Sequence, residues 1–561
     1  MSPLLSVNNL TISFHSETGL IPGVQDINLE VRRNEIVALV GESGSGKSIT
    51  ALSVMQLLPA PPAKYLSGEI LFTDSGNHRV DLLKQSFPQM KRIRGSQIAM
   101  IFQEPMSSLN PVLTCGEQVV EAIRAHEHIR YREARELTIE LFGKVRLPDP
   151  AAIFSHYPHQ LSGGQKQRIM IAMAMSGHPS LLICDEPTTA LDVTVQQTIL
   201  QLIRELQQTE NMGVLFITHD LGVVAEIADR ALVMYKGRIV EEGPVQELFL
   251  RPKHPYTKGL LNCRPILHAK GKRLPVVSDF MGHKVHHESP KPVVATTDRE
   301  PLIQVEHCRV WYPAKKSFLG RPLSYTKAVD DVSFEIYRGE TLGLVGESGC
   351  GKTTLGRAVL RLITPDAGRI LFEGADLADY SGAALQKLRK DIQIVFQDPY
   401  SSLNPRLTIG SAIAEPLKVH GLVATEKQRR ARVEEWLERV DLKADHFNRY
   451  PHEFSGGQRQ RIVIARALIM EPSFVVCDES VSALDVSVQA QVINLLNDLK
   501  KDLGFTVLFI SHDLSVVKYI SDRILVMNKG RIEETGPAEE VFLHPKTAYT
   551  QRLISSIPGF K

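Results

Sequence analysis

Residues 41–48 read Gly-Glu-Ser-Gly-Ser-Gly-Lys-Ser, and residues 346–353 read Gly-Glu-Ser-Gly-Cys-Gly-Lys-Thr. Each stretch follows a short apolar run and precedes a segment that is compatible with a helix. A strand, a glycine-rich loop and a helix in this order form the setting of a phosphate-binding loop. The glycines let the backbone approach phosphate oxygens, and the start of the helix offers free N–H groups. Two matches in equivalent places predict two phosphate sites.

The two loops carry the side chains that a nucleoside triphosphate with Mg²⁺ requires. We expect Lys47 and Lys352 to contact the β- and γ-phosphates, and the hydroxyls of Ser48 and Thr353 to bind Mg²⁺. The other loop residues predicted to contact the nucleotide are Gly41, Ser43, Gly44 and Gly46 in the first loop and Gly346, Ser348, Gly349 and Gly351 in the second.

The repeat extends far beyond the loops. The second loop begins 305 residues after the first, and later motifs return after 293 or 294 residues. These motifs are Gln103 and Gln397, Ser162-Gly163-Gly164-Gln165 and Ser455-Gly456-Gly457-Gln458, Asp185-Glu186 and Asp478-Glu479, and His219 and His512. One duplicated domain explains the spacing better than a solenoid, whose period would be about 20–50 residues. We predict domains at 1–262 and 301–561, with a linker at 263–300.

Two acidic residues end an apolar run in each half. In the first half the run is Leu181–Cys184 and the pair is Asp185-Glu186; Asp478-Glu479 is its counterpart. An aspartate here suits the Mg²⁺ shell, and a glutamate can polarise the water that attacks the γ-phosphate. His219 and His512 each follow an apolar run, where we expect them to contact the γ-phosphate. We therefore predict Glu186, Glu479, His219 and His512 as catalytic, and Asp185 and Asp478 as Mg²⁺ ligands.

The composition excludes several classes of protein. Of 561 residues, 43% are hydrophobic and 23% are charged, which is typical of a globular chain. The net charge of +2 argues against bulk attraction to nucleic acid. No apolar run reaches the length of about 18 residues that a membrane span needs, so we expect any channel to be another chain. None of the six cysteines are spaced as Cys-x-x-Cys, which favours a reducing compartment.

These motifs, in this order, resemble the ATP-binding-cassette (ABC) ATPases. The resemblance covers nearly the whole chain and implies an α/β fold of two tandem P-loop NTPase domains. Each domain would have a RecA-like core, an antiparallel β subdomain and an α-helical subdomain. The implied cofactors are ATP and Mg²⁺. The resemblance also implies that Gln103 and Gln397 contact both the nucleotide and Mg²⁺.

In that family two cassettes pair head to tail, with two ATP molecules between them. The resemblance therefore implies that Lys47 shares its nucleotide with Ser455 and its neighbours, and Lys352 with Ser162 and its neighbours. An aromatic residue near the start of the domain stacks on adenine in the family. Phe14 and Tyr312 match that position, although each could equally be a core aromatic residue.

Further motifs resemble the dipeptide, oligopeptide and nickel importer ATPases within the family. They are Met100–Pro111 and Ile394–Pro405, Tyr157–Ser162 and Tyr450–Ser455, His254–Leu261, and the weaker echo Ala548-Tyr549-Thr550. The fused two-domain form resembles the ATPase subunits of glutathione, microcin-type peptide and opine importers. This resemblance implies two transmembrane permease subunits and an external solute-binding protein. It also implies a peripheral location on the cytoplasmic face of the bacterial inner membrane.

Two other readings remain. Ribosome-associated translation factors also carry two cassettes in one chain, but typically with a long, charged, helical linker that residues 263–300 do not resemble. DNA-repair ATPases of the superfamily usually interrupt the cassette with a coiled coil or zinc modules, and this chain shows neither pattern. Both cassettes retain their key residues, so we predict that both hydrolyse ATP. Ser480 stands where the first half has Pro187, which leaves room for unequal rates.

Overall fold

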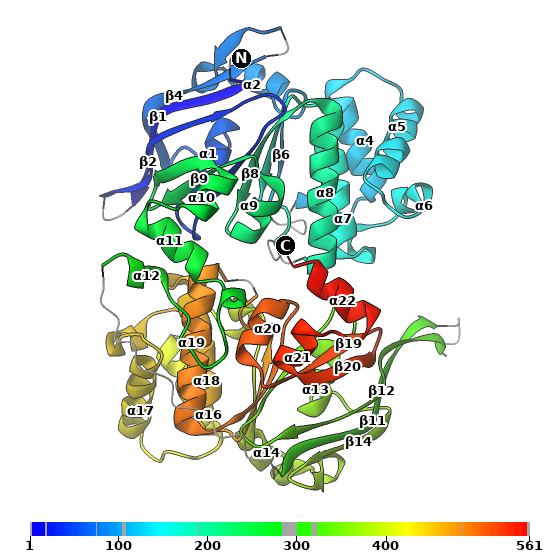
Figure 1. The fold of residues 1–561 in the computed structure, drawn as a ribbon, viewed down its shortest axis with the longest axis vertical. Coiled ribbons are helices and arrows are strands. Elements are labelled where there is room, and N and C mark those ends of the chain that lie inside the picture. Colours follow the sequence, from blue (N-terminus) through cyan, green and yellow to red (C-terminus); the bar gives the residue numbers. More distant parts are fainter. Residues whose placement is uncertain are drawn as a thin grey trace. The chain divides into compact units, whose positions relative to one another are not determined.

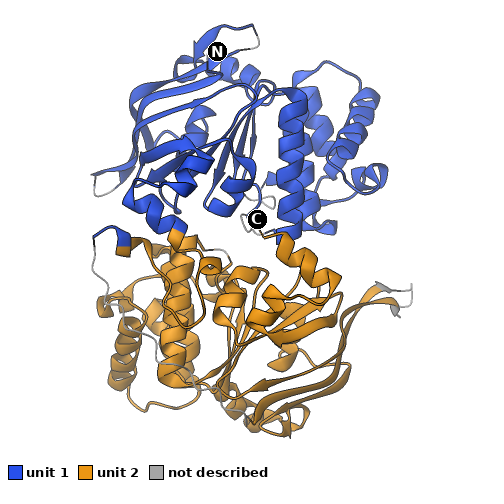
Figure 2. Ribbon diagram, in the orientation of Figure 1, with its two compact units in different colours: residues 1–261, 280–282, 558–561 blue, residues 262–279, 283–557 orange. Residues whose placement is uncertain are grey.

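The computed structural model describes residues 3–16, 19–74, 76–103, 108–189, 191–282, 300–316, 322–482 and 484–557. Contacts divide the chain into two compact units (Figure 2). The first unit comprises residues up to 261 together with 280–282, and the second comprises 262–279 and the described residues from 300 to 557.

The core of the first unit is a six-stranded sheet with strand order β10-β9-β3-β8-β7-β6 (Figure 1). All neighbours pair in parallel except β9 and β10, which are antiparallel. The strands are β3 (Ile36–Val40), β6 (Ile98–Ile101), β7 (Leu181–Asp185), β8 (Gly213–Thr218), β9 (Arg230–Tyr235) and β10 (Arg238–Pro244). The helices beside them are α1 (Lys47–Val54), α7 (Gly163–Met175), α8 (Val193–Glu210), α9 (Leu221–Ile227), α10 (Val245–Leu250) and α11 (Pro255–Asn262).

This sheet is covered on both faces, which is why its strands are apolar throughout rather than alternating. In β7, Leu181 and Ile183 pack into one hydrophobic cluster, while Leu182 and Cys184 pack into another. Side chains of successive strand residues point to opposite faces, so the two clusters are the two sides of one sheet. The acids that follow therefore emerge at the carboxyl edge of a rigid, buried strand.

Two smaller parts complete the first unit. An antiparallel sheet of order β2-β1-β4-β5 contains β1 (Leu5–Ser16), β2 (Gly19–Val31), β4 (Ala63–Thr73) and β5 (Arg79–Asp81), with α2 (Phe87–Ile93) following. A helical part contains α4 (Cys115–His126), α5 (Tyr131–Lys144) and α6 (Pro150–Phe154), which contact one another and, for α4 and α5, also α7.

The second unit repeats this plan. Its mixed sheet has the order β16-β17-β18-β13-β19-β20, and its antiparallel sheet the order β12-β11-β14-β15. The strands are β11 (Pro301–Lys316), β12 (Pro322–Tyr337), β13 (Thr341–Val345), β14 (Ala367–Phe372), β15 (Ala375–Asp376), β16 (Ile392–Val395), β17 (Phe474–Asp478), β18 (Thr506–Ile510), β19 (Arg523–Asn528) and β20 (Arg531–Pro537). The helices are α13 (Lys352–Val359), α14 (Gly382–Asp391), α15 (Pro399–Ser402), α16 (Ile409–Val419), α17 (Glu426–Arg439), α18 (Gly456–Leu468), α19 (Val486–Leu503), α20 (Leu514–Ile520), α21 (Ala538–Leu543) and α22 (Ala548–Ser555). The predicted fold class, two tandem cassettes of three parts each, is confirmed.

Residues 262–279, here called the strap, pack on the second unit although they follow the first in sequence. Asn494 of α19 is 3% exposed and holds the main chain of Leu274 on both sides. Its Oδ1 accepts from the Leu274 N–H at 2.9 Å, and its Nδ2 donates to the Leu274 carbonyl at 2.9 Å. Leu274 itself is 1% exposed. This part of the chain, which includes α12 (Val277–Phe280) at its end, was expected to be linker.

Charged and aromatic contacts extend the docking of the strap. Lys270 pairs with Asp522 at 2.6 Å, and the Tyr519 hydroxyl donates to the Lys272 carbonyl. The first half has Gln201 where the second has Asn494, and Glu226 where the second has Tyr519. The first half repeats the aspartate, as Asp229, but neither Asn494 nor Tyr519, so only part of the binding site for the strap recurs there. Residues 283–299 of the predicted linker lie outside the described residues.

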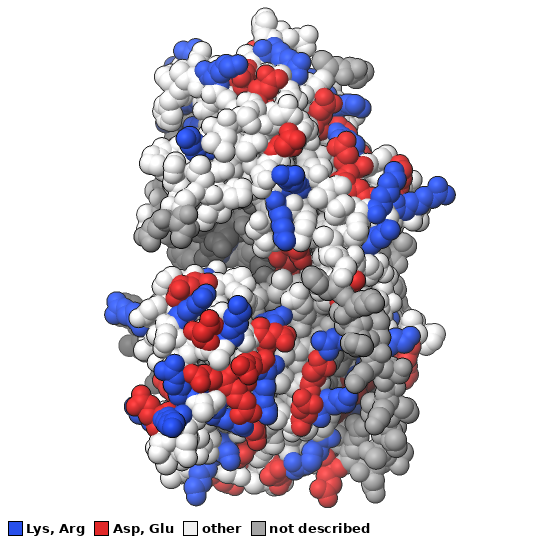
Figure 3. Space-filling model, turned by 90° about the vertical axis from the view of Figure 1, so that its left-hand side faces the viewer, with Lys and Arg blue, Asp and Glu red and all other residues white. Residues whose placement is uncertain are grey.

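Two further properties bear on function. No helix within the described ranges is long and apolar enough to cross a membrane. On the face shown in Figure 3, acidic and basic side chains are interspersed over the described surface.

Candidate active sites

The first phosphate loop lies between β3 and α1 and needs glycine at its end. Gly46 has a φ of 106°, and a Cβ there would lie 2.9 Å from the Gly23 carbonyl oxygen. In the second loop Gly351 has a φ of 110°, and a Cβ would lie 1.9 Å from the Ala328 carbonyl oxygen. Both the left-handed backbone and the close approach of a neighbouring strand therefore exclude a side chain.

The loop lysines are folded back over their own loops. Lys47 is 5% exposed, and its ammonium group donates to the carbonyls of Gly41 and Glu42 at 2.8 and 2.9 Å. Lys352 donates in the same way to Gly346 and Glu347 at 2.8 and 3.0 Å. A buried cation in a glycine-rich loop that leads into the start of a helix is an arrangement that attracts phosphate oxygens.

The hydroxyl and the aspartate predicted as Mg²⁺ ligands meet in both units, whereas Gln103 and Gln397, also predicted as ligands, donate to Glu186 and Glu479. The Ser48 hydroxyl donates to Asp185 Oδ1 at 3.1 Å, and the Thr353 hydroxyl donates to Asp478 Oδ1 at 3.0 Å. The first pair is 137 residues apart in sequence. A hydroxyl and a carboxylate are hard oxygen donors, which fit the one or two protein ligands that Mg²⁺ takes beside nucleotide phosphates. The donor set therefore fits the implied metal.

Glu186 lies at the centre of a set of polar contacts. Its Oε2 accepts from the Gln103 amide at 3.1 Å and from the Thr189 hydroxyl at 2.9 Å, and His219 Nδ1 lies 3.2 Å away. Its backbone is left-handed, with a φ of 49°. Loop, glutamine, carboxylates and histidine thus come together as the sequence predicts, whereas Thr189 was not predicted.

The second unit repeats the set with one difference. Glu479 Oε2 accepts from the Gln397 amide at 2.8 Å, and His512 Nδ1 lies 3.3 Å away. Ser482, the counterpart of Thr189, instead donates to the Glu479 main-chain carbonyl at 2.9 Å. In the sequence this difference appears only as the change from Thr to Ser. That change does not predict which acceptor the hydroxyl will reach.

Burial and neighbouring charges move the pKa values of the two acids in opposite directions. Burial raises the pKa of Asp185 to about 6, against the hydrogen bond from Ser48. Burial alone would also raise the pKa of Glu186, but His219, Lys47 and Thr189 outweigh it and lower the pKa to about 2. In the second unit burial raises the pKa of Asp478, while His512 and Lys352 lower that of Glu479 against its burial. The glutamate is thus held as a carboxylate ready to orient water.

The raised pKa of Asp185 makes a testable prediction for the nucleotide-free protein. Between its ordinary pKa of 3.8 and about 6 the folded state binds the proton more tightly than the unfolded state. This group therefore costs stability as the pH rises through that window, and the cost is complete above about pH 6. Asp185→Asn keeps the acceptor for Ser48 and removes the charge. We expect it to stabilise the protein at pH 7.5 by up to about 3 kcal/mol, and by less at pH 5.

The measurement is urea unfolding with and without Mg²⁺ and ATP. Asp185→Asn should lose the added stability that Mg²⁺ gives with ATP, because a neutral amide is a poorer ligand. Asp192→Asn, which keeps the side-chain cap of α8, is the control. Equal stability of Asp185→Asn and the parent at both pH values would contradict a buried charge that its neighbours only partly compensate.

The Ser-Gly-Gly-Gln segments start α7 and α18. The Ser162 hydroxyl accepts from the Gln165 N–H at 3.3 Å, and the Gln165 side chain accepts from the Ser162 N–H at 2.9 Å. Ser455 and Gln458 form the same capping box before α18. Gly163, Gly164, Gly456 and Gly457 fill the first turns, where free N–H groups point out of the helix.

The predicted adenine-stacking residues lie in the antiparallel sheets. Phe14 pairs with Ile21 and Ala63 in β1, and its ring is close enough to Gly23 to meet an added Cβ there at 2.6 Å. Tyr312 in β11 is 42% exposed and pairs with Thr326. Their stacking role stays a prediction.

Most of these motifs lie in segments of both halves that match a known family. The family model described as "ABC transporter" matches residues 24–189 and 329–482. This chain belongs to that family. A second model, "Oligopeptide/dipeptide transporter, C-terminal region", matches residues 240–281 and 534–561.

Curated relatives agree over the full length. Proteins named glutathione import ATP-binding protein from Salmonella choleraesuis, Escherichia coli O6:H1 and Shigella boydii are each 50% identical over 560 residues. The match covers 99% of this chain and 89% of each relative. Among solved structures, the dimeric ATP-binding cassette MJ0796 with ADP and phosphate is 29% identical, with a TM-score of 0.38. That match covers 42% of this chain and 98% of the cassette.

As a member of the ABC family, the chain is an ATPase, and its C-terminal segments place it in the oligopeptide/dipeptide transporter group. The predicted family, fold, ATPase activity and peptide-type subgroup are confirmed. The roles of individual residues, and Mg²⁺ as the metal, stay proposals that the geometry supports.

Proposed function

We propose that the chain drives the import of peptides or related small solutes, such as glutathione, through two separate permease subunits at the cytoplasmic face of the bacterial inner membrane. The observation that carries this proposal is the similarity to glutathione import ATP-binding proteins over 99% of the chain. Both cassettes also hold the lysine, aspartate, glutamate, glutamine and histidine that we assign to an ATP site. A solute-binding protein outside the membrane would deliver the solute to the permeases.

We propose that equivalent residues have the same roles at both sites. The loop lysine and backbone hold the phosphates, and Ser48 with Asp185, or Thr353 with Asp478, would hold Mg²⁺. The metal would neutralise phosphate charge when bound. Glu186 or Glu479 would then orient the attacking water, while the glutamine and histidine hold that carboxylate. We further propose that the two cassettes pair head to tail, so that Ser455 or Ser162 completes the opposite site.

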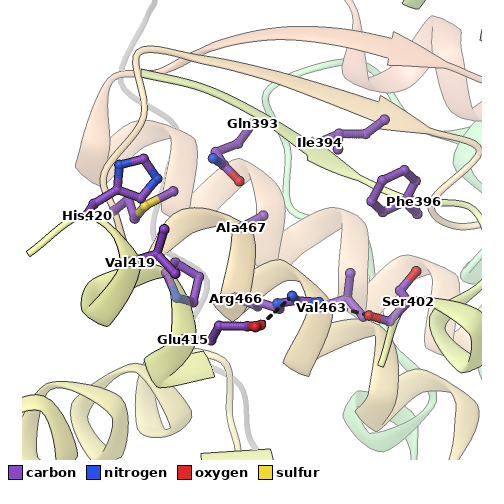
Figure 4. A pocket seen from close by; sticks show the side chains of 12 residues that line it. Gln393, Ile394, Phe396, Ser402, Glu415, Val419, His420, Val463, Arg466 and Ala467 are labelled. Carbon is purple, nitrogen blue, oxygen red and sulfur yellow. Dashed lines mark hydrogen bonds and ion pairs between the residues drawn. The ribbon is translucent and has the colours of Figure 1, made fainter. Parts of the chain in front are cut away.

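A pocket in the second unit suits the docking of a permease segment (Figure 4). It has a volume of about 310 Å³ and lies between β16, α16 and α18. Phe396 and Val419 line it, and an ion pair between Glu415 and Arg466 at 2.8 Å crosses one side. Phe396 directly precedes Gln397, which contacts Glu479. A side chain inserted here from a permease would contact Phe396, the chain neighbour of Gln397, and would so link the permease to the ATP site.

The test is a pull-down of the tagged chain from detergent-solubilised membranes, with the recovered proteins identified by mass spectrometry. We expect two multi-span permeases. Val419→Asp should reduce their recovery, because Val419 is 57% exposed at the pocket. The matched control is Leu543→Asp, at a leucine that is 53% exposed on α21. Recovery with ribosomes and no membrane protein would overturn the transport proposal and leave the ATPase chemistry intact.

A further inference from the structure

The C-terminal segment of each half reaches the start of the phosphate loop through one tyrosine. Tyr256, the second residue of α11, is 0% exposed, and its hydroxyl accepts from the Glu42 N–H at 3.0 Å. Tyr549, the second residue of α22, is 8% exposed, and its hydroxyl accepts from the Glu347 N–H at 3.1 Å. The two contacts are 214 and 202 residues long in sequence, so the fold, rather than local geometry, makes them.

The contacted peptide group also holds the loop lysine. The peptide bond between Gly41 and Glu42 offers its carbonyl to Lys47 Nζ at 2.8 Å and its N–H to Tyr256 at 3.0 Å. The bond between Gly346 and Glu347 is held in the same way, by Lys352 at 2.8 Å and Tyr549 at 3.1 Å. Rotation of this peptide would move the lysine away from the phosphates. The tyrosine therefore fixes one end of the group that positions the cation.

The tyrosines are themselves anchored to the central sheet. Glu241 of β10 accepts from the Lys253 and His254 N–H groups at 2.7 and 3.0 Å, just before α11. Glu534 of β20 accepts from the Lys546 and Thr547 N–H groups at 2.9 and 3.2 Å, just before α22. In each half the glutamate precedes its tyrosine by 15 residues, although His254-Pro255 in one half is Thr547-Ala548 in the other. The two halves thus differ in the residues just before the tyrosine but share the glutamate and the tyrosine themselves.

From this geometry we propose that Tyr256 and Tyr549 are positioning residues for ATP binding, and that this is a task of the C-terminal segments. They act through the phosphate loop and its lysine and do not touch the nucleotide. Replacing either tyrosine by phenylalanine removes only the hydroxyl and leaves a partly buried N–H group without its acceptor. The freed peptide can rotate, so affinity for ATP falls while the chemical step is unchanged. The proposal rests on the ATPase activity of the chain and not on its cargo.

The experiment compares steady-state ATP hydrolysis of the full chain with Tyr256→Phe, Tyr549→Phe and the double variant. We expect the double variant to raise the KM for ATP about five- to tenfold, with kcat within twofold of the parent. Each single variant should weaken one of two nucleotide-binding steps in a fluorescence titration. Tyr235→Phe is the control, because the Tyr235 ring lies 4.3 Å from that of Tyr256 but belongs to β9.

Thermal unfolding with and without ATP separates positioning from plain stability. A lower unfolding temperature without ATP, together with an unchanged KM, would show a purely structural role and overturn the proposal. So would a loss of kcat at unchanged KM, or an equal effect of Tyr235→Phe. If the double variant does not fold, the two single variants decide by the same criteria. If the parent chain itself did not hydrolyse ATP, the ATPase activity on which the proposal rests would be absent.

Discussion

Replacing Glu186 and Glu479 together by glutamine is expected to lower ATP hydrolysis at least about 100-fold while both sites still bind Mg²⁺ and ATP. The reason is that an amide cannot carry the negative charge that polarises the attacking water, and such catalysis contributes about 10²–10⁴-fold. Glutamine has the same side-chain length as glutamate, so it can still contact Gln103 or Gln397. Phosphate release measures hydrolysis, and a fluorescent ATP analogue measures binding.

The control for this change is Glu205→Gln, a carboxylate of α8 that is exposed and paired with Arg146 at 2.7 Å. It makes the same chemical change in a surface ion pair, so hydrolysis should stay within twofold of the parent. Turnover at the parent rate in the double variant would mean that other groups orient the water, and the roles assigned to Glu186 and Glu479 would be wrong.

Lys47→Ala is expected to weaken ATP binding at its own site by about 10- to 100-fold and to leave the other site unchanged. Removing a buried cation that holds phosphate oxygens costs about 1.5–3 kcal/mol. Lys352→Ala should give the mirror result. Titration calorimetry on each variant should show one binding step lost and one kept.

Lys47→Arg serves as the comparison within this series. It keeps the positive charge but not the compact shape that lets Lys47 reach the Gly41 and Glu42 carbonyls, so binding should be partly lost. If Lys47→Ala abolished binding at both sites equally, the two sites would be obligatorily coupled rather than independent.

The sequence predicted the ATP-site clusters because strand order in a parallel sheet brings loops together at one edge. Ser48 and Asp185 meet across 137 residues since β3 and β7 both lie beside β8 and end at the same edge. Their residue types and order were enough to predict this meeting. The ATP-site contacts depend on the order of the strands in the sheet. Apolar runs and glycine loops indicate that order in the sequence.

Other features depend on side-chain geometry that a single sequence does not display. Thr189 reaches the Glu186 carboxylate whereas Ser482 turns to a main-chain carbonyl, and both are small hydroxyl residues. Tyr256 lies within the subfamily motif His254–Leu261, but its contact with Glu42 follows only from where α11 lies. Residues 263–279 were expected to be linker because periodicity is lost from about residue 263 to 300, and because Lys270–Thr297 is rich in Lys, Pro, His and Val. The docking of the strap depends on the buried Asn494 amide, 220 residues further along the chain.

The strap also has a consequence for how the two halves can be handled as separate polypeptides. Residues 262–279 continue the first repeat in sequence, yet their burial and hydrogen bonds belong to the second. If the gene were split at residue 300, the second product would lack Leu274, and the side-chain amide of Asn494 would be exposed. A split at residue 261 would keep the strap, residues 262–279, attached to the second product, on which it packs. The order of the halves therefore matters, because the segment that follows the first half packs on the second.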